Sequence, residues 1–304
     1  MKQLKTEPGN QPVSIEEMDD VASPIHDVWR VFRKNKMAIV GAGIIIIFIL
    51  VAIFAGWLAP EGIDEQKTDQ PDALLHEPSA AYWFGTDEFG RDILSRVMYG
   101  ARLSLWVGFI SVIGAITVGV FLGVIAGFYG RWLDILISRI FDVMLAFPSI
   151  LLAIAIVAML GPSLRNALIA IALVNVPIFG RLIRSKVLSL KEEDYIEAAR
   201  SIGMSDLRIL FHHILPNSLS PIIVQGTLSI ATAILDAAAL GFLGLGAQPP
   251  EPEWGRMLAD SRSLIQRGAP WTVMAPGVCI MLTVLGFNLL GDGLRDALDP
   301  KMKM

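Results

Sequence analysis

The chain has 304 residues, of which 54% are hydrophobic and 18% are charged, and its formal net charge is −4. Its mean hydropathy is +0.57, and its charged fraction lies below the roughly 25% that is usual in soluble domains. A net negative chain without a dense Lys/Arg tract excludes nucleic acid as an expected partner. Cys279 is the only cysteine, so no intrachain disulfide can form and we interpret this thiol as core packing.

The first 36 residues are polar and include a cluster of acidic side chains between Glu16 and Asp20. The apolar block that follows is too long for the core of a signal peptide and lacks a small-residue cleavage site. We therefore expect residues 1–36 to form a cytoplasmic tail and the block to remain in the membrane as an anchor.

Apolar blocks of membrane-spanning length follow one another along the chain. Ile39 to Leu58 contains no charged residue, and about 20 apolar residues in a helix match the bilayer core. Because lipid offers no hydrogen-bond partner to the backbone, each spanning block is predicted to be helical. The sequence therefore predicts an all-α polytopic membrane protein of about six helices, kinked at Pro148 and Pro177. The blocks lie near residues 37–59, 103–128, 135–160, 164–183, 218–246 and 271–291.

The distribution of Lys and Arg predicts the orientation. With the N-terminus in the cytoplasm, the cytoplasmic segments hold 17 of the 25 basic residues, and Lys67 is the only external lysine. Both termini are therefore expected in the cytoplasm, with residues 60–102 and 247–270 outside. We divide the chain into the tail 1–36, a first helix with its external loop (37–102), a transmembrane domain (103–292) containing a cytoplasmic loop (189–216), and a tail (293–304).

The cytoplasmic loop from Ser189 to Pro216 has the pattern of two short amphipathic helices joined at a glycine. Gly203 stands where a residue of positive φ would end the first helix, and Pro216 would stop the second. Ser189 with Glu192 predicts a capping box for the first helix, and Ser205 predicts a cap for the second. The apolar faces comprise Tyr195, Ala198, Ala199 and Ile202, then Leu207, Leu210, Phe211 and Ile214. Spacing alone is equally typical of interfacial helices on the membrane surface.

Other residues invite simpler interpretations. Thr86 or Asp87 could cap an external interfacial helix, whose apolar face would comprise Leu94, Val97, Met98 and Ala101. Arg139 and Asp142 are spaced for an intrahelical ion pair. His212-His213 has no second ligand cluster at metal-binding spacing, so no metal site is expected. A series of glycines suits close helix packing, namely Gly108, Gly114, Gly119, Gly123 and Gly127.

Asp236 lies inside the fifth apolar block, about 22 Å from its cytoplasmic end at 1.5 Å per residue. A carboxylate at that depth is costly unless it faces protein or water. It either lines a substrate path or pairs within the helix bundle, and the sequence alone favours neither.

The chain lacks a GxxxxGK[ST] motif, so we do not expect it to bind ATP itself. It also lacks HExxH and GxSxG, so an enzyme is not supported and no cofactor of its own is expected.

Several motifs resemble one family of transporters. Glu197-Ala198-Ala199, Gly203 and Ile214-Leu215-Pro216 resemble the EAA loop of ABC importer permeases. The external run from Phe84 to Arg96 and the segments at residues 240–246 and 253–255 resemble the dipeptide/oligopeptide/nickel permeases. The ending from Phe287 to Pro300 is similar to their C-type subunit. The resemblance covers roughly residues 28 to 301.

The resemblance implies a type I ABC importer transmembrane domain in a bacterial inner membrane. Its partners would be a B-type permease, two cytoplasmic ABC ATPases that use ATP and Mg, and an extracytoplasmic substrate-binding protein. The expected ATPase-docking residues are Glu197, Ala198, Ala199 and Gly203. Because the family's fifth helix lines the path, the resemblance tips Asp236 toward the translocation path. The expected external platform for the binding protein comprises Gly85, Thr86, Asp87, Gly90, Arg91 and Asp92.

Two rival functions stay open at this point. A nickel permease of the same family would have the same architecture. An ion-coupled secondary transporter would need no ATPase, but inverted repeats and several buried ionisable groups would favour it, and only Asp236 fits.

Overall fold

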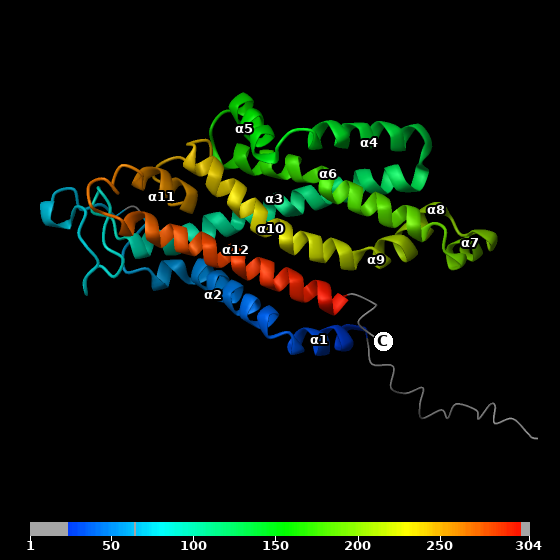
Figure 1. Ribbon diagram of the computed structural model, residues 1–304, viewed down its shortest axis with the longest axis horizontal. Helices are drawn as coiled ribbons and strands as arrows, with labels where there is room; N and C mark the ends of the chain where they lie inside the picture. The colour runs from blue at the N-terminus through cyan, green and yellow to red at the C-terminus, as the bar shows by residue number, and fades with distance from the viewer. Residues whose placement is uncertain (1–23, 64, 299–304) are drawn as a thin grey trace, which may run out of the picture.

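The computed structural model describes residues 24–298, apart from residue 64, and these fold into helices that run largely along one long axis (Figure 1). The long apolar helices are α2 (Lys36–Leu58), α3 (Ile93–Tyr129), α6 (Leu164–Leu190), α10 (Leu219–Phe242) and α12 (Trp271–Leu298). The shorter ones are α1 (Pro24–Lys34), η2 (Pro71–Ala73), α4 (Arg131–Leu145), α5 (Ser149–Leu160), α7 (Asp194–Ser201), α8 (Asp206–Ile209), η3 (Leu210–Ile214), α9 (Leu215–Asn217) and α11 (Trp254–Ser261).

The five long helices can each cross a membrane, and α4 with α5 makes a sixth span if the bent pair is taken as one. This confirms the predicted number of about six. The pair bends by 94° just before α5, where Pro148 occupies the N-cap, so the predicted kink is a complete break. Pro177 lies inside α6, which runs past the predicted end at residue 183 as far as Leu190.

The core of the bundle is the pair α3 and α6, which make the most extensive helix–helix contact of the described residues. Glycines permit this approach: a Cβ on Gly123 would lie 2.4 Å from the carbonyl oxygen of Gly180 on α6. Gly119 and Gly127, one turn away on either side, face α6 with similarly little room. The predicted close packing is confirmed at these positions and brings the two backbones into direct contact.

Ion pairs fasten α4 to α6. The Arg184 guanidinium donates to both carboxylate oxygens of Asp134, with a distance of 2.7 Å from Nη2 to Oδ2. Arg181 pairs with Asp142, which also lies 3.7 Å from Nη1 of Arg139. The predicted pair of Arg139 and Asp142 is therefore confirmed, and Asp142 also bridges to the neighbouring helix.

The N-terminus of α3 corrects one prediction. The carboxylate of Asp92 accepts hydrogen bonds from the backbone N of Ser95 (2.7 Å) and from its Oγ (2.6 Å), so Asp92 is the N-cap. Neither Thr86 nor Asp87 caps the helix. Thr86 donates to the carbonyl oxygen of Ala73, and Asp87 accepts from Arg91. The predicted external helix is also not separate, since its residues form the first turns of α3.

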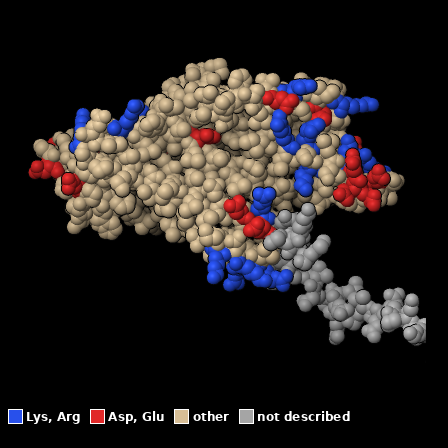
Figure 2. All heavy atoms as spheres, in the orientation of Figure 1, with Lys and Arg blue, Asp and Glu red and all other residues tan. Residues whose placement is uncertain are grey.

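Charged side chains gather at the two ends of the long axis (Figure 2). Between them, the visible face is a nearly uncharged band that an acidic side chain interrupts. A band of this kind is what a bilayer core requires, because an unpaired charge in hydrocarbon is costly.

Candidate coupling loop, translocation surface and external cap

The loop of residues 189–216 lies at one end of the bundle, beyond the ends of α3 and α6 (Figure 1). Gly203 ends α7 with φ of +83°, which confirms the predicted turn. The N–H of Gly203 donates to the carbonyl of Arg200, and that of Met204 to the carbonyl of Ala199. A Cβ at Gly203 would meet no atom within 4 Å, so the backbone conformation alone requires the glycine.

The inner side of this loop belongs to the bundle core. Ile196 and Ala199 of α7 are buried, as are Ile209 of α8 and Ile214 of η3. They form one apolar cluster with the ends of three long helices, through Val124 and Phe128 of α3, Ile183 and Val187 of α6, and Ile222 of α10. A displacement of the loop must therefore move these helix ends, because a close-packed cluster does not deform freely.

Polar and aromatic contacts reinforce the attachment. Lys191 donates from Nζ to the carbonyl oxygen of Phe128 at 2.9 Å, and the Arg200 guanidinium lies 5.8 Å from the centre of the Phe128 ring. The rings of Tyr195 and His213 meet edge to face at 6.0 Å and link α7 to η3. The two halves of the loop thus form one unit.

The outer side of the loop exposes large apolar side chains among charged ones such as Glu193, Glu197 and Arg208. Ile202 is 80% exposed, Leu207 61% and Phe211 60%, and with the exposed ring of Tyr195 they form what we call the loop patch. Large apolar side chains gathered on an exposed surface mark an interaction site. Among the predicted docking residues, Glu197, Ala198 and Gly203 are exposed, whereas Ala199 is buried against the bundle.

Three local predictions for this loop were wrong. Ser189 lies in the last turn of α6, and α7 begins instead after Glu193 without a side-chain cap. Ser205 occupies the N-cap of α8, but its side chain makes no capping hydrogen bond. Pro216 does not stop the second helix, because the π-helical turn η3 precedes it and α9 continues to Asn217, with the proline in its first turn.

Asp236 lies partly exposed on α10 and lines a hollow of about 300 Å³. No ion pair or hydrogen bond joins its carboxylate to any other residue in the described part of the chain. The walls come from the bend between α4 and α5, from α6 and from α10 itself. They comprise Met144, Leu145, Phe147, Ser149, Val174, Asn175, Ile178, Thr232 and Leu235.

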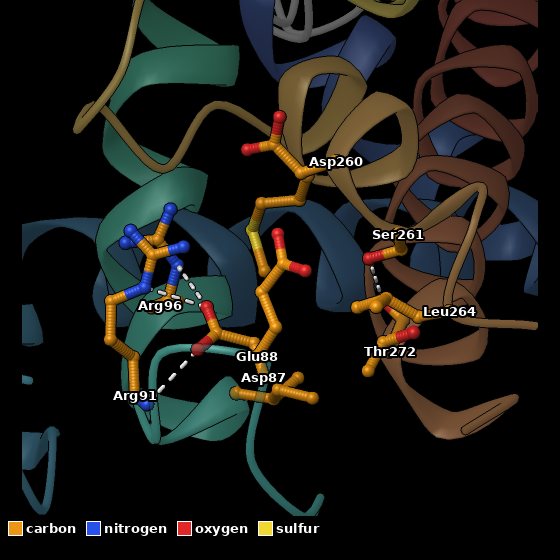
Figure 3. Close-up of a pocket in the computed structure, with 10 residues that line it drawn as sticks. Asp87, Glu88, Arg91, Arg96, Asp260, Ser261, Leu264 and Thr272 are labelled. Atoms are coloured by element: carbon orange, nitrogen blue, oxygen red, sulfur yellow. Dashed lines mark hydrogen bonds and ion pairs between the residues drawn. The ribbon is translucent and has the colours of Figure 1, made fainter. Parts of the chain in front are cut away.

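The external motif forms a buried charged cluster at the opposite end of the bundle. Figure 3 shows Arg91 and Arg96 pointing toward the carboxylate of Asp87. Nε of Arg91 lies 2.6 Å from Oδ2 of Asp87, and Nε of Arg96 lies 3.9 Å from the same atom. Thr86 is fully buried and donates from Oγ1 to the carbonyl of Ala73 at 2.6 Å. These side chains hold the loop that precedes α3 onto that helix.

Two glycines of the motif supply the turns. Gly85 and Gly90 have φ of +74° and +69°, a region that favours glycine. A Cβ on Gly85 would lie 2.7 Å from the carbonyl oxygen of His76 and from the Trp271 ring, so this turn also lets α12 approach.

Sequence reasoning did not assign a role to Glu253, which organises the same end. Its carboxylate accepts from the backbone N of Gly255 and Arg256, each at 2.9 Å, and from Ser104 Oγ at 3.2 Å. It thereby caps α11 and joins it to α3. Burial raises the pKa of Glu253, although its hydrogen bonds act in the opposite direction. The signal was weak, because glutamate is not among the preferred N-cap residues.

Together, the apolar spans, the exposed loop of residues 189–216 and the hollow beside Asp236 are the features of a multi-pass helical membrane protein. A family model described as the binding-protein-dependent transport system inner membrane component matches residues 119–304, and the chain belongs to this family of ABC importer permeases. A model for the N-terminal TM domain of oligopeptide transport permease C matches residues 23–78.

Named relatives support the same placement. The chain is 65% identical over 302 residues to the dipeptide transport system permease protein DppC of Alkalihalophilus pseudofirmus, covering 99% of this chain and 98% of the relative. It is 51% identical over 284 residues to the di/tripeptide transport system permease protein DppC of Pseudomonas aeruginosa, covering 92% and 93%. It is 52% identical over 285 residues to the glutathione transport system permease protein GsiD of Escherichia coli, covering 94% and 93%.

A solved structure shows the same fold. An inward-facing conformation of the MetNI methionine ABC transporter contains a chain that matches 68% of this one and 98% of its own length, with a TM-score of 0.54 and 20% identity. The chain thus has the fold of a type I ABC importer transmembrane domain.

Proposed function

We propose that this chain is one half of the translocation path of an ATP-driven importer of di- and tripeptides. The observation that carries the proposal is the two-sided loop of residues 189–216. Its inner side is packed into α3, α6 and α10, and its outer side exposes the loop patch. A surface built in this way can receive a force from outside and pass it to the spanning helices.

The force would come from ABC ATPase subunits that dock on the loop patch. Burial of Ile202, Leu207 and Phe211 would supply the apolar contact, and the exposed carboxylate of Glu197 would accept hydrogen bonds or pair with a base. Because the chain has no GxxxxGK[ST] motif, ATP and Mg would be bound by these partners. Closure of the ATPase pair would move the loop and switch the path between outward and inward access.

The path itself would run along the face that carries Asp236, with a B-type permease forming the other half. An unpaired carboxylate beside a hollow in the membrane offers an attractive position to the ammonium group of a peptide. The external cap of Asp87, Arg91 and Glu253 would hold the surface that receives the substrate-binding protein.

Small peptides are the substrate class that the relatives support, since the names of three of them specify dipeptides, di/tripeptides and glutathione. These names do not favour the nickel alternative. A secondary transporter is also not favoured, because the family couples transport to a binding protein.

The orientation completes the proposal: both termini and the loop of residues 189–216 would face the cytoplasm, as the Lys and Arg distribution indicates. A reporter that is active only in the cytoplasm should then be active when it is fused after Met304. A reporter that is active only outside the cytoplasm should be active when it is inserted at Asp72. The reverse pattern would contradict both the orientation and the placement of the ATPases.

The proposed function is tested by reconstituting the complete transporter, with its partner permease, ATPases and binding protein, in liposomes. Labelled dialanine should accumulate in the lumen only when two conditions are met. The binding protein and the substrate must be outside the liposomes, and ATP must be inside, on the side of the ATPases. Accumulation that needs an ion gradient and no ATP would contradict the proposal, as would ATP-driven uptake of nickel but not of the peptide.

A further inference from the structure

A second hollow, of about 470 Å³, lies at the end of the bundle that carries the coupling loop. Its walls come from the C-terminal part of α6, the end of α9, the first turns of α10 and the end of α12. They comprise Leu182, Lys186, Asn217, Ser220, Pro221, Val224, Gln225, Leu228, Arg295 and Leu298. The lining is therefore apolar on several sides, with amide and hydroxyl groups and two cations.

The two cations, Lys186 and Arg295, come from different helices and face the same hollow. Within residues 24–298, neither takes part in an ion pair or a hydrogen bond. Other basic side chains at this end do, since Arg181 and Arg184 pair with carboxylates of α4. Lys186 and Arg295 thus leave their donors available to a ligand in the hollow.

This hollow continues the face that carries Asp236. On α6, Ile178 lines the hollow at Asp236, and Leu182 and Lys186 line the second one at steps of four residues. On α10, Asp236 and Thr232 line the first hollow and Leu228 lines the second, again at steps of four residues. Because residues four apart share one side of a helix, the two hollows lie along one groove between α6 and α10. Its inner part has one unpaired carboxylate, and its end has two unpaired cations.

We propose that Lys186 and Arg295 bind the C-terminal carboxylate of a peptide as it leaves the path on the cytoplasmic side. This inference rests on the proposed function and adds an anion-binding exit site to it. A free peptide is a zwitterion, with an ammonium group at one end and a carboxylate at the other. Asp236 and Leu228, the nearest α10 residue that lines the second hollow, lie about 12 Å apart along the helix, so a dipeptide cannot reach both sites at once. The carboxylate of Asp236 and the two cations would instead receive the opposite charges of the peptide one after the other, and Arg and Lys are the side chains that bind carboxylates.

A lipid headgroup phosphate would be attracted by the same cations, so the test must separate the two. Lys186 and Arg295 are exposed, and the open hollow that they line has apolar and amide walls, which fit a small peptide better than a convex surface would. Vesicles of phosphatidylcholine alone lack anionic lipid and those with added phosphatidylglycerol contain it, so the two compositions distinguish the sources.

The experiment compares dialanine with alanyl-alaninamide, which keeps the ammonium group and lacks the carboxylate. Saturation-transfer NMR would measure the affinity of each peptide for the nucleotide-free complex without binding protein. The double variant Lys186→Gln/Arg295→Gln should weaken dialanine binding about tenfold, which is about 1.4 kcal/mol. It should leave alanyl-alaninamide unchanged. The matched control Lys34→Gln removes an exposed cation on α1 and should change neither.

Uptake by the reconstituted transporter provides the second measurement. The double variant should lower dialanine uptake by a similar factor in both lipid compositions, with ATPase co-purification unchanged. The inference would be overturned if the double variant bound dialanine as tightly as the parent does. A loss that is the same for both peptides, or one that appears only with anionic lipid, would also overturn it. If the parent transporter itself imports no peptide, the proposed function fails instead.

Discussion

Gly123 of α3 lies directly against Gly180 of α6, so closely that a Cβ on Gly123 would come within 2.4 Å of the Gly180 carbonyl oxygen. Both helices end in the apolar cluster that holds the loop of residues 189–216. Their contact therefore supports the part of the molecule that would receive the movement of the ATPases.

The substitution Gly123→Leu should separate these helices. An isobutyl group has no room between two backbones, and overpacking typically costs about 1–3 kcal/mol. We expect a lower melting temperature in detergent, measured by fluorescence-detected size exclusion after heating. Gly43→Leu is the matched control, because a Cβ at Gly43 meets no atom within 4 Å. Equal melting temperatures for the two variants would show that α3 and α6 are not in close contact.

The turn at Gly203 should tolerate asparagine and not valine. The residue needs positive φ, which costs a β-branched side chain about 1 kcal/mol or more, whereas asparagine adopts this region more readily. Gly203→Val should reduce both ATPase co-purification and substrate-stimulated ATP hydrolysis, and Gly203→Asn should retain most of each. A Cβ at Gly203 meets no atom within 4 Å, so crowding within this chain does not explain the difference. Similar losses in both variants would contradict the role of the backbone conformation.

Asp236→Asn should lower peptide uptake more than it lowers the amount of folded transporter. The change keeps the size of the side chain and removes the charge that would attract the peptide ammonium group. Asp292→Asn is the control, since Asp292 is exposed on α12 and lies outside this hollow. Uptake per folded complex should fall several-fold only for Asp236→Asn. Normal uptake by that variant would assign Asp236 no part in transport.

The raised pKa of Glu253 predicts that the stability of the protein depends on pH. Burial raises its pKa in the folded protein above the value of about 4.3 expected for the unfolded chain. The folded state then holds the proton more tightly, so the stabilisation is complete below about pH 4.3 and declines as the pH rises through the folded pKa. The melting temperature of the parent should fall relative to that of Glu253→Gln as the pH rises from 4 to 8. A difference that does not change with pH would contradict this account.

Composition predicted the spans well, because a bilayer core fixes both the length and the apolarity of a crossing helix. The turn at Gly203 was also predictable, since few other residues end a helix with positive φ. The face of α7 that meets the bundle was not. The apolar pattern of Tyr195, Ala198, Ala199 and Ile202 was assigned to one side, yet the buried residues are Ile196 and Ala199.

The reason is physical: α7 carries apolar residues on two sides, one buried against the bundle and one left exposed. Periodicity detects apolar positions and does not identify what covers them. The cap of α3 was missed for a related reason. Thr86, Asp87 and Asp92 are all suitable caps, and only the path of the external loop decides that Asp92 is the one used.

Photo-crosslinking from the loop patch tests the central claim most directly. Benzoylphenylalanine at Ile202 in the assembled transporter should crosslink to an ATPase subunit, and the yield should change when ATP is bound. The same group at Trp57, which is exposed near the C-terminal end of α2 and far from the loop, should give no ATPase product. If Ile202 crosslinks only to lipid or to nothing while the complex imports peptide, the loop is not the coupling surface and the account is wrong.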